Sequence, residues 1–133
     1  MIGTGKERDL RDRDLVRLGG VVVGGVPATA SKVTVLAEFA GGALKAEQIA
    51  QLALGARLRA YRFDRYKTKR KEDDEHAEKV ELNFACANPA AAERAWRRVE
   101  GTADGVVMAR DLINEPANVL YPVEFARRAS GLR

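Results

Sequence analysis

The sequence contains a single cysteine, Cys86, and a single histidine, His76, and this scarcity narrows its chemistry. One cysteine cannot form an internal disulfide, so we expect a reducing compartment, the cytoplasm. A Ser–His–Asp or Cys–His catalytic site could form only around His76, which lies in an acidic polar segment. Such a segment lacks the fixed geometry of a metal site, so a solvated loop is the simpler interpretation. Cys86 falls on the apolar face of an expected strand, where a buried, inert thiol is the usual finding.

Long apolar segments are also missing. No run approaches the roughly 20 apolar residues that cross a bilayer, and the first residues lack the apolar core of a secretory signal. We therefore expect no membrane partner. Hydrophobic residues make up 46% and charged residues 32% of the 133, which is typical of one soluble globular domain. The net charge of +4 is weak evidence for a nucleic-acid partner.

Hydrophobic periodicity predicts alternating strands and helices. The expected elements are a strand end at 2–6, a helix at 9–18 continuing through the glycine-rich 19–27, a strand at 32–39, a helix at 44–61, a strand at 80–86, a helix at 88–114 and a last helix from 122. The segment 64–79 is polar and is expected to be an exposed loop. This order predicts an α/β fold, with a mixed, mainly parallel sheet flanked by helices and a long linker helix at its end.

Side-chain spacing predicts which faces are buried. In the helix 44–61 the core stripe is Ile49, Leu52, Ala53, Ala56 and Ala60, and in the helix 88–114 it is Ala92, Ala95, Trp96, Val99, Ala103, Val106 and Val107. In the strand 80–86, Val80, Leu82, Phe84 and Cys86 share one face. The small residues of 19–27 are expected to let that helix pack closely on a sheet, and Gly101 and Gly105 to leave room for close packing.

Proline and asparagine residues mark the helix ends. Asn88 and Pro89 predict an N-cap followed by a first helical residue. Pro116 lacks an N–H and clashes inside a helix, so the preceding helix should stop near Asn114. Pro122 has the φ of a first helical position, and a new helix should begin there.

Two segments resemble a known family. Residues 110–120, Arg-Asp-Leu-Ile-Asn-Glu-Pro-Ala-Asn-Val-Leu, with Pro122, Glu124, Phe125 and Ala126, resemble the junction between the N-terminal and catalytic domains of leucyl (cytosol) aminopeptidases. Residues 60–69, Ala-Tyr-Arg-Phe-Asp-Arg-Tyr-Lys-Thr-Lys, resemble the end of a helix in the family's N-terminal domain. One departure is Tyr121, where the family usually has a capping threonine. A lost cap costs roughly 1 kcal/mol, so the last helix is expected to fray.

The resemblance implies a macro-domain-like N-terminal domain that is truncated at both ends, in which residues 1–87 are a partial α/β domain. Residues 88–133 are then a linker helix and a junction leading to an absent catalytic domain. It also implies a parent enzyme that removes N-terminal amino acids from peptides with two divalent ions, Zn or Mn, and that assembles as a hexamer. The family's metal-ligand motif does not occur in this sequence, so no catalytic, cofactor-binding or metal-binding residue can be assigned. A structural role is implied for the residues that match the junction, which are Arg110, Asp111, Asn114, Pro116 and Asn118.

The basic and aromatic segment 61–71 leaves two interpretations open. In one, this chain is a free-standing α/β module that binds nucleic acid or protein, with cations on phosphates and rings on bases. In the other, the cations complement a helix C-terminus that is followed by a solvated loop. Equally, Tyr61, Phe63 and Tyr66 can serve as anchors that hold this loop to the core or to the catalytic domain. The fragment Gly3-Thr-Gly5-Lys6 lacks the further residues of a phosphate loop and is interpreted as a turn. Few strands leave an exposed sheet edge, which predicts self-association as a homo-oligomer.

Overall fold

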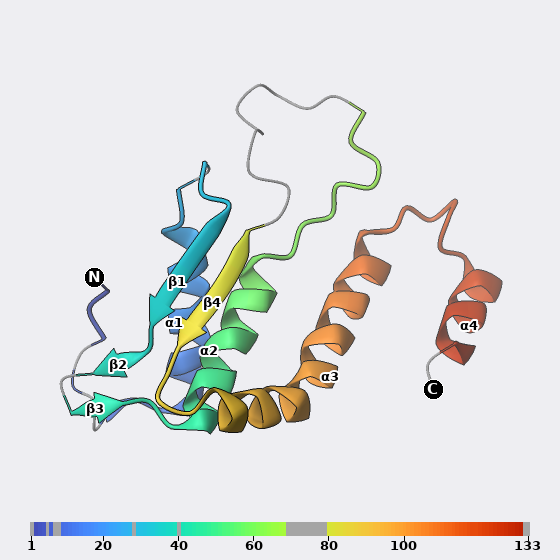
Figure 1. The fold of residues 1–133 in the computed structure, drawn as a ribbon. Coiled ribbons are helices and arrows are strands. Elements are labelled where there is room, and N and C mark those ends of the chain that lie inside the picture. The colour runs from blue at the N-terminus through green and yellow to red at the C-terminus, as the bar shows by residue number, and fades with distance from the viewer. Residues whose placement is uncertain are drawn as a thin grey trace.

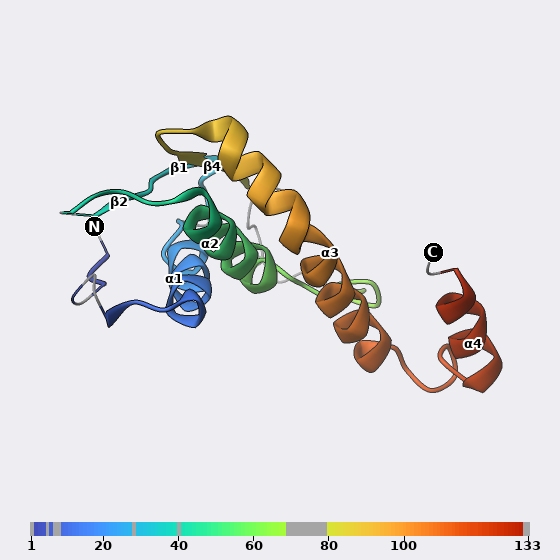
Figure 2. The ribbon, with the colours of Figure 1, turned by 90° about the horizontal axis from the view of Figure 1, so that it is seen from below.

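A computed structural model describes residues 2–4, 6, 9–27, 29–39, 41–68 and 80–131, and its body is a small sheet backed by two helices (Figure 1). Strand β1 (Lys32–Leu36) pairs in parallel with β4 (Glu81–Ala85). Helices α1 (Asp12–Gly24) and α2 (Ala46–Arg59) lie on the same face of this pair (Figure 2). The expected α/β fold with parallel strands is confirmed. The two flanking helices, however, lie on the same face of the sheet and not one on each face.

The strand expected at 32–39 divides at Ala37. The Ala37 N–H donates to the Ala85 carbonyl at 3.2 Å, and the Ala37 carbonyl accepts from the Leu44 N–H at 3.2 Å. The chain then forms an antiparallel pair of its own, β2 (Glu38–Phe39) with β3 (Gly42–Ala43). Gly42 has φ +124°, a backbone conformation that favours glycine at this turn. The strand end expected at 2–6 is wrong for residues 2–4 and 6, which lie in no strand.

Helices α1 and α2 cross at glycines. A Cβ atom at Gly19 would lie 1.9 Å from the Leu52 carbonyl oxygen, and one at Gly55 would lie 1.7 Å from the Val16 carbonyl oxygen. The two backbones therefore approach as closely as only glycine permits. The expected continuation of the first helix through the glycine-rich segment is confirmed to Gly24. The expectation that this segment packs on a sheet is wrong, because its close contact is with a second helix.

The core lies between these helices and the sheet. Its buried cluster consists of Leu15, Ala37, Leu44, Ile49, Leu52 and Ala92. Of the stripe expected along α2, Ile49, Leu52 and Ala56 are buried, whereas Ala60 is exposed because the helix has already ended at Arg59. On β4, Val80 is exposed and Leu82, Phe84 and Cys86 are only half-buried. These side chains line an open groove towards α3, which explains why the predicted inward face is incompletely covered.

Two further helices carry the chain away from the body (Figures 1 and 2). Helix α3 (Pro89–Asn114) packs on α2 and begins as expected, since the Asn88 side chain accepts a hydrogen bond from the Ala91 N–H at 3.0 Å. Its stripe is buried at Ala92, Ala95 and Ala103 and half-buried at Trp96, Val99, Val106 and Val107. Gly101 and Gly105 face open space, so the close packing expected there is absent from the described residues. Helix α4 (Pro122–Ser130) starts without a side-chain cap at Tyr121, as expected.

Candidate functional site

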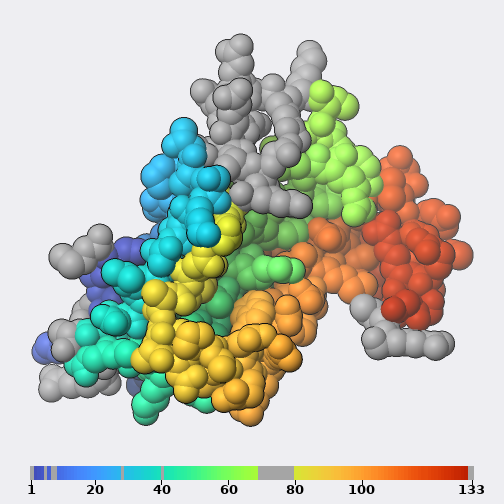
Figure 3. Space-filling view, in the orientation of Figure 1, coloured from blue at the N-terminus to red at the C-terminus, as the bar shows by residue number. Residues whose placement is uncertain are grey.

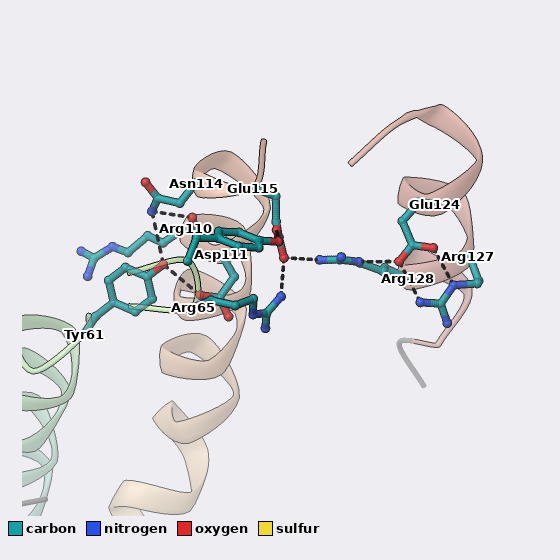
Figure 4. A network of polar contacts seen from close by, with 10 residues as sticks. Tyr61, Arg65, Arg110, Asp111, Asn114, Glu115, Glu124, Arg127 and Arg128 are labelled. Carbon is teal, nitrogen blue, oxygen red and sulfur yellow. Dashed lines mark hydrogen bonds and ion pairs between the residues drawn. The ribbon is translucent and has the colours of Figure 1, made fainter. Parts of the chain in front are cut away.

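The candidate site is the connection between α3 and α4. Helix α3 ends at Asn114, and Glu115 takes the extended conformation (φ −68°, ψ 135°) that a residue before proline prefers. The carbonyl of Pro116 then accepts hydrogen bonds from the N–H groups of Val119 and Leu120, both at 2.9 Å, which closes a tight turn. This local chemistry confirms the helix end predicted from Pro116. It also turns the Glu115 side chain away from the helix ladder and towards neighbouring elements (Figure 4).

Glu115 is the centre of a hydrogen-bonded cluster that joins three elements, the segment 61–68, the end of α3, and α4. Its side chain is fully buried, and its carboxylate accepts hydrogen bonds from the Tyr66 hydroxyl and the Arg65 guanidinium. From α4, the Arg128 guanidinium donates to the same carboxylate at 3.0 Å. A buried carboxylate needs such partners, because an unpaired charge is costly to remove from water. We call Glu115, Arg65, Tyr66 and Arg128 the Glu115 clamp.

The partners of Glu115 favour its ionised form. The Tyr66 hydroxyl bond holds the pKa of Glu115 below its ordinary value, and Arg128 and Arg65 act in the same direction, while burial opposes them. The same hydrogen bond raises the pKa of Tyr66 above its ordinary value, since a charged phenolate beside a carboxylate is unfavourable. At neutral pH the clamp is therefore a carboxylate held by one hydroxyl and two guanidinium groups.

A second cluster surrounds the hydroxyl of Tyr61. Its partners on α3 lie about one helical turn before Glu115. This hydroxyl donates to an Asp111 carboxylate oxygen at 2.8 Å and accepts from the Asn114 side-chain amide at 3.2 Å. The Arg110 guanidinium lies over the Tyr61 ring, 5.5 Å from its centroid, and donates to the Leu58 carbonyl at 2.6 Å. That carbonyl belongs to the last turn of α2, where a cation is favoured. Burial, followed by the bond to Asp111, raises the pKa of Tyr61.

Helix α4 carries its own ion-pair network. The Glu124 carboxylate accepts from Arg127 at 2.7 Å and from Arg128 at 2.8 Å, so Arg128 bridges Glu124 and Glu115 (Figure 4). These arginines lower the pKa of Glu124 to about 2. None of the residues of α4 is buried, and Val123 and Phe125 are 73% and 51% exposed. Polar contacts rather than a hydrophobic core therefore hold α4 beside α3.

The junction residues that were predicted from the sequence do not all lie in one cluster. The structure brings Arg110, Asp111 and Asn114 together around Tyr61, and Asn114 also donates to the Arg110 carbonyl at 2.8 Å, as residues one turn apart can. Pro116 closes the turn, and Asn118 is exposed within it, outside both clusters. Sequence reasoning did not single out Glu115. The only signal was a carboxylate directly before a proline, where the chain must leave the helix.

The described part of the segment 61–71 makes contacts within the chain. Tyr61, Arg65 and Tyr66 all bind α3, and Phe63 packs against Tyr66 with ring centroids 5.8 Å apart. Lys67 pairs with Asp64 at 2.8 Å. These contacts favour the anchor interpretation over a free nucleic-acid surface. Residues 69–71, and the acidic segment around His76 that was expected to be a loop, lie outside the described residues.

Metal-binding clusters and membrane-spanning helices are both absent from the described ranges. Across that part of the chain, no three His, Cys, Asp or Glu side chains gather closely enough to hold a metal ion. Every helix within the same residues is too short or too polar to cross a lipid bilayer. Cys86 is half-buried and packs against the core cluster, rather than being fully buried as expected.

Comparison with known sequences decides the family. The model of the N-terminal domain of the cytosol aminopeptidase family matches residues 1–70. The chain belongs to the cytosol aminopeptidase family. A probable cytosol aminopeptidase of Afipia carboxidovorans is 53% identical over all 133 residues, and one of Rhodopseudomonas palustris is 50% identical. The chain spans about a quarter of the length of these curated relatives, 26% and 27%.

Solved structures agree with this assignment. The bottromycin maturation enzyme BotP in complex with Mn superposes with a TM-score of 0.75 and 26% identity, covering 97% of this chain and 26% of that protein. A mutant of tomato leucine aminopeptidase has the same TM-score, 0.75, over 97% of this chain and 26% of its own length. Its 23% identity supports the fold alone. The resemblance and the fold class expected from the sequence are confirmed.

Proposed function

We propose that this chain is the N-terminal, non-catalytic part of a metal-dependent leucyl aminopeptidase and that its junction holds the following domain in a fixed orientation. Residues 1–87 form the α/β domain, and residues 88–133 form the linker helix and the junction that leads to the catalytic domain. The observation that carries the proposal is the Glu115 clamp. It ties α4 to both α3 and the segment 61–68, through a buried carboxylate whose hydrogen bonds fix direction as well as distance.

In this proposal the complete enzyme is cytoplasmic and hexameric, and it releases N-terminal residues from peptides with two divalent ions, Zn or Mn. The names of the relatives and the Mn in the BotP complex support the activity and the metal class. The described side chains do not fit a pair of such ions. The carboxylates of Glu115 and Glu124 are occupied by arginines and a tyrosine, and no acidic or histidine trio gathers within the described residues. The catalytic chemistry therefore belongs to the remainder of the enzyme.

An activity measurement tests this assignment. We expect the isolated chain to release no p-nitroaniline from leucine-p-nitroanilide with added manganese or zinc. The full-length Afipia carboxidovorans relative, assayed beside it under the same conditions, supplies the positive control. Turnover by the isolated chain, retained after further purification, would overturn the non-catalytic assignment.

We further infer that the segment 61–68 is an anchor for α3 and not a platform for nucleic acid. The hydroxyls of Tyr61 and Tyr66 donate hydrogen bonds to Asp111 and Glu115 at the end of α3, and the Arg65 guanidinium pairs with Glu115. Fluorescence anisotropy with a labelled DNA at low salt should show no affinity that falls steeply as salt is added. Steep salt dependence would restore the nucleic-acid interpretation.

A further inference from the structure

The chain that follows α2 is attached to α3 at two points. The Tyr61 hydroxyl donates to the Asp111 carboxylate at 2.8 Å. The Tyr66 hydroxyl donates to the Glu115 carboxylate. The Glu115 N–H donates to the Asp111 carbonyl at 3.1 Å, so these two acceptor residues lie one helical turn apart. We call residues 61–67 the strap, which lies in light green at the surface next to the orange end of α3 (Figure 3).

The strap is held in one shape between its two points of attachment. The Lys67 N–H donates to the Asp64 carbonyl at 3.2 Å, which closes a turn with Arg65 and Tyr66 at its centre. The Phe63 ring centroid lies 5.8 Å from that of Tyr66 and 5.9 Å from the guanidinium carbon of Arg65. Phe63 therefore positions both of the side chains that the strap contributes to the Glu115 clamp.

Contacts at the two ends of the strap extend it to α2 and to α4. At its start, the Arg110 guanidinium lies over the Tyr61 ring and donates to the Leu58 carbonyl in the last turn of α2. At its end, the Glu115 carboxylate also accepts from Arg128 of α4 at 3.0 Å (Figure 4). A continuous series of contacts between described residues thus runs from the end of α2 to α4.

We propose that the strap couples the last turn of α2 to the direction of α4, so that the Tyr61 contact and the Glu115 clamp form and break together. When one end of a short, stiff linker is bound, its other end meets its own site at a high effective concentration. The Tyr61 contact therefore favours the clamp, although the partners of its hydroxyl lie on α3. By linkage, the clamp favours the Tyr61 contact by the same factor. This inference rests on the proposed role of the clamp and adds that a change at the α2 end redirects α4.

Limited proteolysis of the intact chain tests the coupling. The rate of tryptic cleavage after Arg127 and Arg128, identified by mass spectrometry, reports the population in which α4 is released. We expect Tyr61→Phe, which removes the hydroxyl and keeps the ring, to raise this rate about fivefold, at the low end of coupling between sites. The matched control is Asp104→Asn, which breaks the exposed 2.9 Å ion pair with Arg57 between α2 and α3, outside the strap. This control should leave the rate unchanged.

A double-mutant cycle distinguishes coupled contacts from independent ones. In a Glu115→Gln chain the clamp is already broken, so adding Tyr61→Phe should change the cleavage rate by less than about twofold. The aromatic link is tested at Phe63 itself. Phe63→Leu should raise the cleavage rate, whereas Phe63→Tyr, which keeps the ring, should be cleaved as slowly as the wild-type chain.

Each alternative outcome overturns the coupling, provided that circular dichroism shows the variants to be folded. These outcomes are a wild-type rate in Tyr61→Phe, an equal rise in Asp104→Asn, or rate increases that multiply when Tyr61→Phe and Glu115→Gln are combined. If Tyr61→Phe does not fold, the Phe63 variants decide, and equal rates in Phe63→Leu and Phe63→Tyr contradict the coupling. Faster cleavage in Glu115→Gln alone rejects the strap and keeps the clamp. Wild-type rates in both Tyr61→Phe and Glu115→Gln reject the clamp as well.

Discussion

The crossing of α1 and α2 and the junction of α3 and α4 are held by opposite kinds of contact. At the crossing, Gly19 and Gly55 bring two backbones together beside the fully buried Leu15. At the junction, α4 has no buried residue and is held by the Glu115 carboxylate and arginines. Close packing has little tolerance for added volume, whereas charged hydrogen bonds are sensitive to lost charge. The crossing therefore sets the stability of the body, and the junction sets the direction in which α4 leaves it.

The largest effect is expected from adding a methyl group at the crossing. Gly19→Ala or Gly55→Ala would place a Cβ atom within 2 Å of a backbone oxygen, at 1.9 Å and 1.7 Å respectively, so the helices must separate. Overpacking of this kind against backbone should lower the free energy of unfolding by about 3 kcal/mol or more. Urea denaturation followed by circular dichroism measures it. A loss below 1 kcal/mol, roughly the level of an ordinary surface change, would contradict the close crossing.

The next effect is expected from neutralising the clamp. Glu115→Gln keeps the shape of the side chain but removes the charge that holds Arg65 and Arg128. Trypsin should then cleave after Arg127 and Arg128 several-fold faster, with little change in the melting temperature of the body. Glu93→Gln is the matched control, because Glu93 makes an exposed ion pair with Arg97 on the same helix. Equal cleavage rates in the two variants would show that the clamp does not restrain α4.

Acid should release α4 in the wild-type chain. The pKa of Glu124 is lowered to about 2 and the pKa of Glu115 is also lowered, from an ordinary value of 4.5. A carboxylate with a lowered pKa stabilises the folded arrangement at every pH above its ordinary pKa. That contribution is lost as the pH falls through the lowered pKa of the folded state. The Arg128 side-chain Nε–H signal in NMR should therefore stay constant from pH 7 to about 4.5 and shift towards pH 2. A shift complete above pH 5 would contradict the assigned partners.

The smallest effect is expected where α3 has room to spare. A Cβ atom at Gly101 would meet nothing within 4 Å, so Gly101→Ala gains helix propensity without a clash. It should raise the free energy of unfolding by about 0.5–1 kcal/mol, in the opposite direction to the same substitution at Gly19. Urea denaturation compares the two on one scale. A destabilising Gly101→Ala would reveal a contact that the described residues do not show.

The helix ends could be predicted from the sequence because their causes are local. Helix α3 begins at Asn88 and Pro89 because the Asn88 side chain caps it and Pro89 has a helical φ already set. It ends before Pro116 because proline has no backbone N–H to continue the helical hydrogen bonds. The parallel pairing of β1 and β4 also followed from alternation of strands and helices. These features need no knowledge of which distant segment lies alongside. The family resemblance also rested on short local stretches, residues 60–69 and 110–126, and the family match confirms the family.

Other features could not be predicted because their causes are distant in sequence. Gly19 was expected to pack on a sheet, but its partner, Leu52 in α2, becomes known only when the helices are placed. Glu115 looks like an ordinary surface carboxylate until Tyr66 and Arg128 surround it. Neither partner lies within a helical turn of Glu115. Such sites form where segments that are distant in the sequence come into contact, and local sequence patterns do not show which segments do so.

The distance between α3 and α4 measures the central claim most directly. Spin labels at Thr102→Cys and Ala129→Cys, both exposed positions, in a Cys86→Ala background would report it by double electron–electron resonance. We predict one narrow distance distribution in the otherwise wild-type chain and a broad one when Glu115→Gln is added. A distribution that is equally broad before and after the substitution would show that the Glu115 clamp does not orient α4, and would contradict the account.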